Sequence, residues 1–137
     1  MLELTSGTAA TRAGVNLETL RYYERRGLLP NPRRSQGNYR LYSEAAVQRI
    51  RFIKRAQDLG FTLVEIKDLL TLTESVEADC SDVRQRALRK IHDVEQRMRD
   101  LNRIKRTLEQ LAEQCRGSSD LGECPILRAL DGGHDEV

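Results

Sequence analysis

The sequence predicts a mainly α-helical fold: a compact helical N-terminal domain with a small two-stranded wing, one long helix and a short C-terminal loop. Three observations predict it. Residues 1–75 hold four short amphipathic segments separated by turn residues, with an alternating polar and apolar segment between the second and third. Residues 81–114 hold no Gly or Pro and carry one apolar stripe, whereas Gly, Ser and Pro recur over 116–125. We therefore divide the chain into residues 1–75, 76–114 and 115–137.

The composition narrows the class of protein. Of 137 residues, 39% are hydrophobic and 32% charged, with four Tyr, two Phe and no Trp. So few large core residues favour long helices that bury a stripe against a partner. No apolar run approaches the roughly 20 residues that span a bilayer, and the N-terminus lacks the pattern of a signal peptide. We therefore expect a cytoplasmic protein with no membrane partner, whose three cysteines are thiols or metal ligands rather than disulfides.

The first two helices are predicted to form a helix-turn-helix. Thr5 is placed to cap a helix that ends near Ala13, and the turn at 14–16 contains Gly14. A second helix follows from Leu17 to about Arg26. Two short helices joined by a turn that contains Gly are typical of this motif, although many small domains hold such a pair.

A small wing is predicted after the second helix. Gly27 is placed to end that helix, and Pro30 and Pro32 prevent its continuation. Side-chain character alternates along residues 33–42 on either side of a central turn, which indicates a two-stranded hairpin.

A second pair of helices follows the wing. Ser43 is placed to cap a third helix, and Thr62 to cap a fourth that runs to about Leu72, with a break at Gly60 between them. The apolar residues of the third helix are Val47, Ile50, Phe52, Ile53 and Ala56, and those of the fourth are Leu63, Ile66, Leu69 and Leu70.

The long helix predicts a dimer. Its apolar residues recur at steps of three and four over about five heptads, as in a coiled coil, and we expect an antiparallel one. They are Val83, Ala87, Ile91, Val94, Met98, Leu101, Ile104, Leu108, Leu111 and Cys115. A hairpin within one chain is excluded because nothing after Gly117 is long enough to pair with it; Ile126–Leu130 offers about one helical turn, and 132–137 should fray. We therefore expect a homodimer.

A concentration of positive charge predicts a nucleic-acid partner. Residues 21–55 hold ten Lys or Arg and two Asp or Glu, although the whole chain carries a net charge of only +2. Such a basic block is suited to binding a polyanion, nucleic acid first. The alternative interpretation is that these charges only form a solvated helix face. The second helix and the wing supply side chains suited to bases and phosphates in the grooves of double-stranded DNA. The candidates are Thr19, Arg21, Tyr22, Tyr23, Arg25, Arg33, Arg34, Asn38, Tyr39 and Arg40. Leu20 and whichever tyrosine of the second helix faces inward are expected to be core instead.

These segments resemble the MerR family of transcription regulators. Residues 13–29 are similar to the family's helix-turn-helix, Gly37–Tyr42 to its wing, and Arg51–Ile53 with Leu59–Leu63 to its second helix pair. The resemblance covers about residues 5–130. Ser6 and Ala9 depart from it, because larger apolar residues usually stand there. It implies a DNA-binding regulator and not an enzyme, and the chain indeed lacks a phosphate loop or a nucleophile and base pair.

The cysteines predict a site shared between two chains. Cys80 and Cys115 stand at opposite ends of the long helix, about 52 Å apart at 1.5 Å per residue. One ion therefore cannot contact both in one chain. If two helices pair antiparallel, Cys80 of one chain meets Cys115 of the other, with Cys124 brought close by the loop, and each dimer holds two sites.

Three thiolates form a site for a soft metal ion. Zinc usually takes four ligands, and His92 lies mid-helix while His134 lies in the tail, so neither completes such a set. Mercury(II) accepts three thiolates. The family resemblance agrees, because Cys80 is typical of the divalent-ion branch and Cys115 with Cys124-Pro125 resembles the loop of its mercury sensors. Lead and cadmium sensors share similar cysteines, so zinc, lead and cadmium stay open.

The resemblance also implies a mechanism. A dimer would bind a promoter whose spacer is too long for RNA polymerase, and metal binding would underwind the DNA and activate a metal-resistance promoter. A thiol redox sensor, in which Cys115 and Cys124 form a disulfide, is the alternative. A purely architectural coiled coil would not need the basic block.

Overall fold

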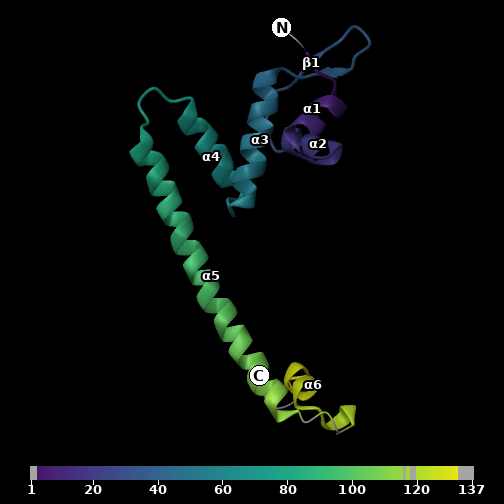
Figure 1. The fold of residues 1–137 in the computed structure, drawn as a ribbon, viewed down its shortest axis with the longest axis vertical. Coiled ribbons are helices and arrows are strands. Elements are labelled where there is room, and N and C mark those ends of the chain that lie inside the picture. Colours follow the sequence, from purple (N-terminus) through teal and green to yellow (C-terminus); the bar gives the residue numbers. More distant parts are fainter. Residues whose placement is uncertain (1–2, 116, 118–119, 133–137) are drawn as a thin grey trace. The chain divides into compact units, whose positions relative to one another are not determined.

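The computed structural model describes residues 3–115, 117 and 120–132. Figure 1 shows its elements: α1 (Ser6–Ala13), α2 (Leu17–Arg25), β1 (Arg33–Arg34), β2 (Arg40–Leu41), α3 (Glu44–Asp58), α4 (Leu63–Thr73), α5 (Cys80–Gln114), the 3-10 helix η1 (Leu121–Glu123) and α6 (Pro125–Leu130). The chain forms two compact units, Met1–Lys90 and Ile91–Val137, and α5 runs from the first into the second. The expected mainly helical fold with one small wing is confirmed.

Polar side chains begin the short helices, as the sequence predicts. The side chains of Thr5, Ser43 and Thr62 each accept a hydrogen bond from the amide three residues later. Thr62 forms a full capping box, because Glu65 accepts in return from the amide of Thr62 at 2.8 Å. Asn16 caps α2 in the same way. Each cap satisfies an amide that has no partner within its helix.

The core of the first unit lies between α1, α2, α3 and α4. α1 packs on both α2 and α3, and α4 packs on α3, as Figure 1 shows. The large side chains that are almost fully buried are Leu20, Tyr23, Leu28, Val47, Ile50, Ile53 and Ile66. Phe52, another apolar residue of α3, is 37% exposed, because it stands outside the buried stripe of Ile50 and Ile53.

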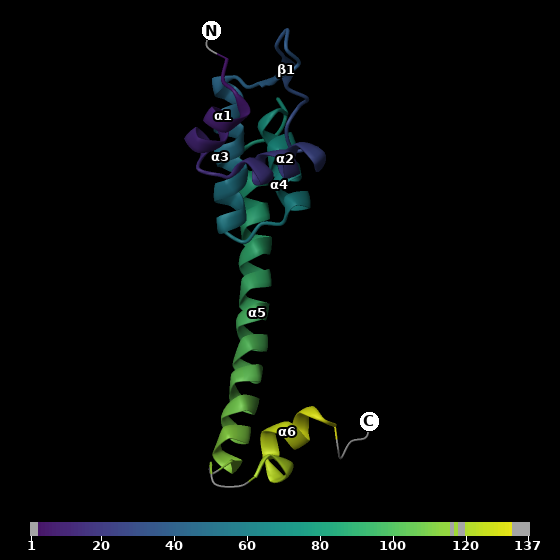
Figure 2. The same ribbon diagram turned by 90° about the vertical axis from the view of Figure 1, so that its right-hand side faces the viewer.

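The wing is a two-stranded antiparallel hairpin. Arg33 pairs with Leu41 and Arg34 with Arg40, and the turn between them places Asn38 at a positive φ of 67°. At its base, Leu4 and Tyr42 exchange two backbone hydrogen bonds of 2.7 and 2.8 Å. Figures 1 and 2 show the hairpin extending beyond the helices of the first unit.

Two ion pairs hold the start of α5 on α4. Lys90 Nζ lies 2.8 Å from Glu65 Oε1, and Arg86 Nε lies 2.8 Å from Asp68 Oδ2. The Lys90 ammonium also lies 5.5 Å from the centre of the Phe61 ring, and the residue is only 7% exposed. The contacts are one turn apart on both helices, so they fix the first three turns of α5 against the first unit.

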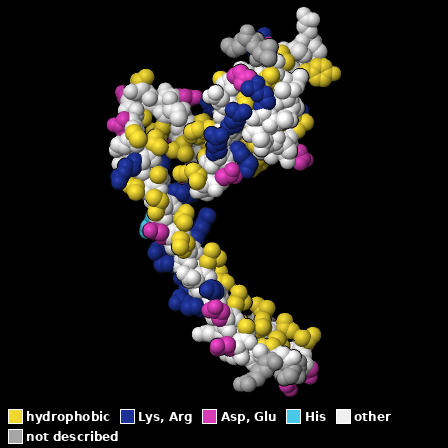
Figure 3. Space-filling view, in the orientation of Figure 1, with side chains coloured by type: hydrophobic (Ala, Val, Ile, Leu, Met, Phe, Trp, Pro, Cys, Tyr) yellow, Lys and Arg dark blue, Asp and Glu magenta, His cyan; other side chains and the backbone are white. Residues whose placement is uncertain are grey.

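An exposed apolar stripe runs along α5 in the single chain. From Val83 to Leu108 the large apolar residues of the predicted seam are each more than 40% exposed, and Figure 3 shows hydrophobic side chains following the helix. Among residues 91–115, 117 and 120–132, none is buried. No helix in the described part of the chain is long and apolar enough to cross a membrane.

The C-terminal segment is more ordered than a loop. Residues 121–123 form one 3-10 turn, and α6 begins at Pro125, one residue before the predicted turn. Proline suits the first position of a helix because its missing N–H needs no partner there. Of the tail expected to fray, residues 133–137 lie outside the described part.

Candidate nucleic-acid interface and metal-binding cysteines

The exposed side of α2 is hollowed and basic. A pocket of about 570 Å³ is lined by Asn16, Leu17, Glu18, Thr19, Arg21, Tyr22 and Arg25. The amide of Thr19 donates to the capping Asn16 Oδ1 at 2.7 Å, which fixes the first turn of the helix. Arg21 is half-buried, and its Nε is buried without a hydrogen-bond partner among the described residues. A buried guanidinium nitrogen without a partner is costly, so this site is suited to an anion or a base acceptor.

Tyr22 lies among positive charges. It is 39% exposed, and the guanidinium carbons of Arg25 and Arg26 lie 5.8 and 5.7 Å from the centre of its ring. Arg26 Nη1 also donates to its hydroxyl oxygen at 2.8 Å. The arginines therefore hold the ring while its hydroxyl proton remains available for a phosphate.

Tyr23 does not belong to this surface. It is 1% exposed, and its hydroxyl donates to Gln57 Oε1 of α3 at 2.6 Å. Burial raises the pKa of its hydroxyl, so the group stays neutral. The proposed DNA contact at Tyr23 is therefore wrong, because the helix turns this ring inward, as was expected for one of the two tyrosines.

The wing brings the other candidates together. Tyr39 is 73% exposed at its tip, next to Asn38. Arg34 Nη1 donates to the carbonyl of Asn38 at 3.0 Å, which closes the turn. Arg33 Nη1 lies 2.8 Å from Glu3 Oε2, but its side chain is 78% exposed and can exchange that partner for a phosphate.

Arg40 is tied to α2 through Glu24. Its Nε donates to Glu24 Oε1 at 3.1 Å, and the hydroxyl of Tyr42 donates to the other carboxylate oxygen. Burial, and then the hydrogen bond to Glu24, raise the pKa of Tyr42 to about 12. The sequence did not predict the role of Glu24, because Glu24 and its partners are 16 and 18 positions apart and meet only in the folded unit.

Two partly buried arginines of α3 donate hydrogen bonds to backbone carbonyls. Arg49 Nε donates to the carbonyl of Leu28 at 2.8 Å, and Arg51 Nη2 to that of Arg12 at 2.7 Å. These carbonyls follow α2 and belong to the last turn of α1, so part of the basic block stabilises helix ends.

Cys115 and Cys124 lie together in the second unit. Cys115 directly follows α5, Cys124 precedes α6, and the Cys115 side chain lies near enough to contribute to the lowered pKa of the Cys124 thiol. The pKa of the Cys124 thiol lies below its usual value, chiefly because the backbone amide of Leu127 donates to it, and then that of Ile126. A lowered pKa favours the thiolate, the form that binds metal.

Cys80 is the first residue of α5 and is exposed. All three cysteines are free thiols. Within the described residues of one chain, no three side chains of Cys, His, Asp or Glu come close enough to share an ion. His92 is exposed on α5, and His134 lies outside the described part.

Comparison with known proteins identifies the family. The family described as MerR HTH family regulatory protein matches residues 4–73, and that described as MerR, DNA binding matches residues 47–111. The mercuric resistance operon regulatory protein of Bacillus cereus is 48% identical over 124 residues, which are 90% of this chain and 94% of that protein.

Two solved structures have the same fold. The regulator PbrR691 of Ralstonia metallidurans CH34 in complex with lead(II) is 37% identical, with a TM-score of 0.81 over 93% of this chain and 98% of that chain. The dual-function regulator MerR of Bacillus megaterium MB1 in complex with mercury(II) is 43% identical, with a TM-score of 0.69 over 89% and 94%. The chain therefore belongs to the MerR family of helix-turn-helix transcription regulators, which bind DNA and are not enzymes.

Proposed function

We propose that this regulator responds to mercury(II) as a homodimer on a promoter in the cytoplasm, with each metal site built from both chains. The observation that carries the proposal is the arrangement of three thiols. Cys115 and Cys124 lie together, whereas Cys80 stands at the opposite end of α5. Because α5 has 35 residues, which correspond to about 52 Å, the third thiol must come from Cys80 of a partner chain in antiparallel orientation.

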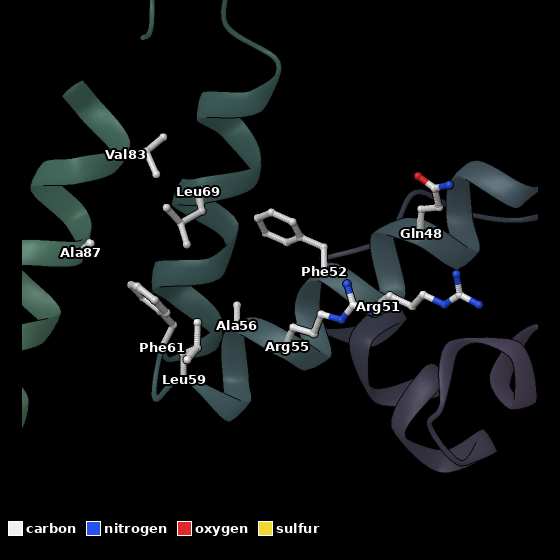
Figure 4. Close-up of a pocket in the computed structure, with 10 residues that line it drawn as sticks. All are labelled: Gln48, Arg51, Phe52, Arg55, Ala56, Leu59, Phe61, Leu69, Val83 and Ala87. Carbon is white, nitrogen blue, oxygen red and sulfur yellow. The ribbon is translucent and has the colours of Figure 1, made fainter. Parts of the chain in front are cut away.

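The exposed apolar surface supports a dimer. A pocket of about 610 Å³ opens between α3, α4 and the start of α5, and Figure 4 shows Phe52, Phe61 and Leu69 around it. Val83 and Ala87 line this pocket and also belong to the predicted seam. A partner helix that covers the seam would therefore cover the pocket as well, and would remove from water the exposed ring of Phe52.

The contacts to DNA follow from the first unit. Arg21, Thr19, Tyr22 and Arg25 would enter the major groove on α2. The wing, with Arg33, Arg34, Asn38, Tyr39 and Arg40, would contact the backbone or the minor groove beside it.

Mercury is favoured by the ligand set and by the relatives. Three thiolates with no histidine at hand suit a soft ion, and a mercuric resistance regulator and a mercury(II)-bound MerR structure are among the similar proteins. The likeness to a lead(II)-bound regulator makes lead the main competitor, ahead of cadmium and zinc.

Metal would activate transcription by deforming the promoter. An ion that binds one conformation of the dimer better shifts the population towards it, and α5 carries the difference to the DNA-binding unit. The resulting underwinding would align the promoter elements for RNA polymerase. The free energy of metal binding would offset the energy needed to deform the DNA.

A redox sensor is the second candidate, and the closeness of Cys115 to the Cys124 thiol favours it. A peroxide would oxidise these thiols to one disulfide and be reduced to water. A response to peroxide without metal, lost under strict reduction, would support this function.

Complementation tests the shared site. Cys80→Ser, and the double variant Cys115→Ser with Cys124→Ser, should each fail to respond to metal as homodimers. Their heterodimer should regain one complete site and bind about one ion per dimer, half the wild-type value. Sites built within one chain would never be restored by mixing, so a verified heterodimer that stays silent would contradict the shared geometry.

Promoter activity measured metal by metal tests the ion. We expect mercury(II) to activate at the lowest concentration, with sulfur-only coordination by X-ray absorption. A preference for zinc or an oxygen-rich shell would overturn the mercury assignment and leave the shared geometry in place.

A further inference from the structure

Glu24 is the one acidic side chain of α2 that faces the wing. Its side chain is only 12% exposed, and its two oxygens accept from Arg40 Nε at 3.1 Å and from the hydroxyl of Tyr42. Arg40 is the first residue of β2 and Tyr42 directly follows that strand. One carboxylate on the DNA-reading helix therefore holds both residues at the base of the wing.

The partners of Glu24 are themselves fixed. Tyr42 is 3% exposed, and its backbone exchanges two hydrogen bonds with Leu4. Arg40 pairs with Arg34 across the hairpin and has a side chain that is 28% exposed. The base of the wing is thus anchored to the N-terminal segment through Leu4 and to α2 through Glu24, and its two strands hold each other.

We infer that Glu24 is a positioning residue for DNA recognition: it sets the placement of the wing relative to α2, so that the helix and the wing tip reach the DNA together. The inference rests on the proposed role of the wing as a DNA contact. Tyr39, the exposed ring at the tip, makes no hydrogen bond to Glu24 in the described part of the chain and can depend on it only through the strand that Glu24 holds.

The chemistry of the carboxylate separates two substitutions. Glutamine keeps an oxygen for Arg40, and its amide nitrogen can donate to the Tyr42 hydroxyl, which accepts as well as donates. Alanine removes both acceptors, so the proton of the buried Tyr42 hydroxyl loses the carboxylate that accepts it. Glu24→Gln should therefore keep the wing in place, and Glu24→Ala should release it.

A double-mutant cycle on operator affinity tests the inference. In the wild-type background, Tyr39→Ala should weaken operator binding roughly fivefold, as for one lost contact. In the Glu24→Ala background the same substitution should cost nothing further, because the released wing no longer reaches the DNA. Hydroxyl-radical footprints should lose the protection at the wing flank and keep that of the groove occupied by α2.

Matched variants separate positioning from folding. Glu24→Gln should restore the fivefold cost of Tyr39→Ala. Asp58→Ala, which breaks an ion pair with Lys54 at the end of α3 that is far from the wing, should leave that cost unchanged whatever it does to the melting temperature. If Glu24→Ala does not fold, Tyr42→Phe removes one of the two hydrogen bonds and enters the same cycle.

Two results would overturn the inference, and they differ. An equal cost of Tyr39→Ala in both backgrounds would show that Glu24 does not position the tip, and the proposed wing contact would stand. No cost of Tyr39→Ala in the wild-type background would overturn the wing contact and the role of Glu24 together.

Discussion

Arg21 shows how one side chain can be prepared for DNA. Its Nε is already removed from water and lacks a hydrogen-bond partner among the described residues, so part of the desolvation cost is met before DNA binds. We predict that Arg21→Ala weakens operator binding with or without metal, and leaves dimerisation and metal affinity unchanged. If Arg21 reaches a base, the loss should be about 1–3 kcal/mol and sequence-selective; if it reaches a phosphate, the loss should be uniform and lower the salt slope by about one. Normal operator affinity would remove Arg21 from the interface.

Adjacent tyrosines on α2 give a matched pair of variants. Tyr23→Phe removes the hydrogen bond to Gln57 in the core, so it should lower the free energy of unfolding by about 1 kcal/mol and leave operator affinity per folded dimer unchanged. Tyr22→Phe removes an exposed hydroxyl on the DNA-facing side, so it should weaken operator binding and barely change stability. Chemical denaturation and fluorescence anisotropy on both proteins check this. The reverse pattern would return Tyr23 to the interface.

At the scale of single elements, most boundaries could be predicted because their causes are local. Caps at Thr5, Ser43 and Thr62 use side chains within three residues of the amides they satisfy, so the sequence carries the signal. The inward turn of Tyr23, the bridge through Glu24 and the ion pairs between α4 and α5 could not be predicted. They depend on which helix faces meet in the fold. The sequence alone does not single out these pairs, because the chain offers many other acidic and basic residues that could pair.

The ion pairs between α4 and α5 predict a pH-dependent stability. The pKa of Glu65 is lowered chiefly by the hydrogen bond from Lys90, and that of Asp68 chiefly by the hydrogen bond from Arg86. Because both values are lowered in the folded state, the added stability is present above the usual carboxyl pKa values of 4.5 and 3.8 and is lost as the pH falls through the lowered ones. The magnitude should be under about 1 kcal/mol, since both carboxylates are partly exposed.

Glu65→Gln isolates that effect, because glutamine can still accept from the amide of Thr62 in the capping box. We expect the variant to be less stable than the wild type at pH 7, and the difference to disappear in acid. Thermal unfolding followed over a pH series measures it. A difference that is constant with pH would mean that the ion pair with Lys90 contributes nothing through its charge.

At the scale of the whole molecule, the sequence indicated a partner because the apolar stripe of α5 has nothing to cover it. The structure shows how exposed that stripe is: Ile91, Met98 and Leu101 are between 52% and 64% exposed in the single chain. It does not follow from one chain which direction a partner helix takes. The proposed metal site requires an antiparallel partner, because only antiparallel helices bring Cys80 of one chain to Cys115 of the other.

The final prediction is an obligate dimer held by this stripe. Leu101→Asp would place a carboxylate in the middle of the seam of each chain, and each buried charge without a partner costs several kcal/mol. We expect the variant to lose the dimer, and with it operator binding and metal response. Gln96→Asp adds the same charge to α5 away from the seam, and it should remain a dimer with near-normal affinity, since exposed like charges cost a few tenths of a kcal/mol. Sedimentation velocity in dilute solution, with circular dichroism to follow helix content, compares the three proteins. A folded wild-type monomer, or a Leu101→Asp variant that stays dimeric, would show that α5 is not the dimer contact.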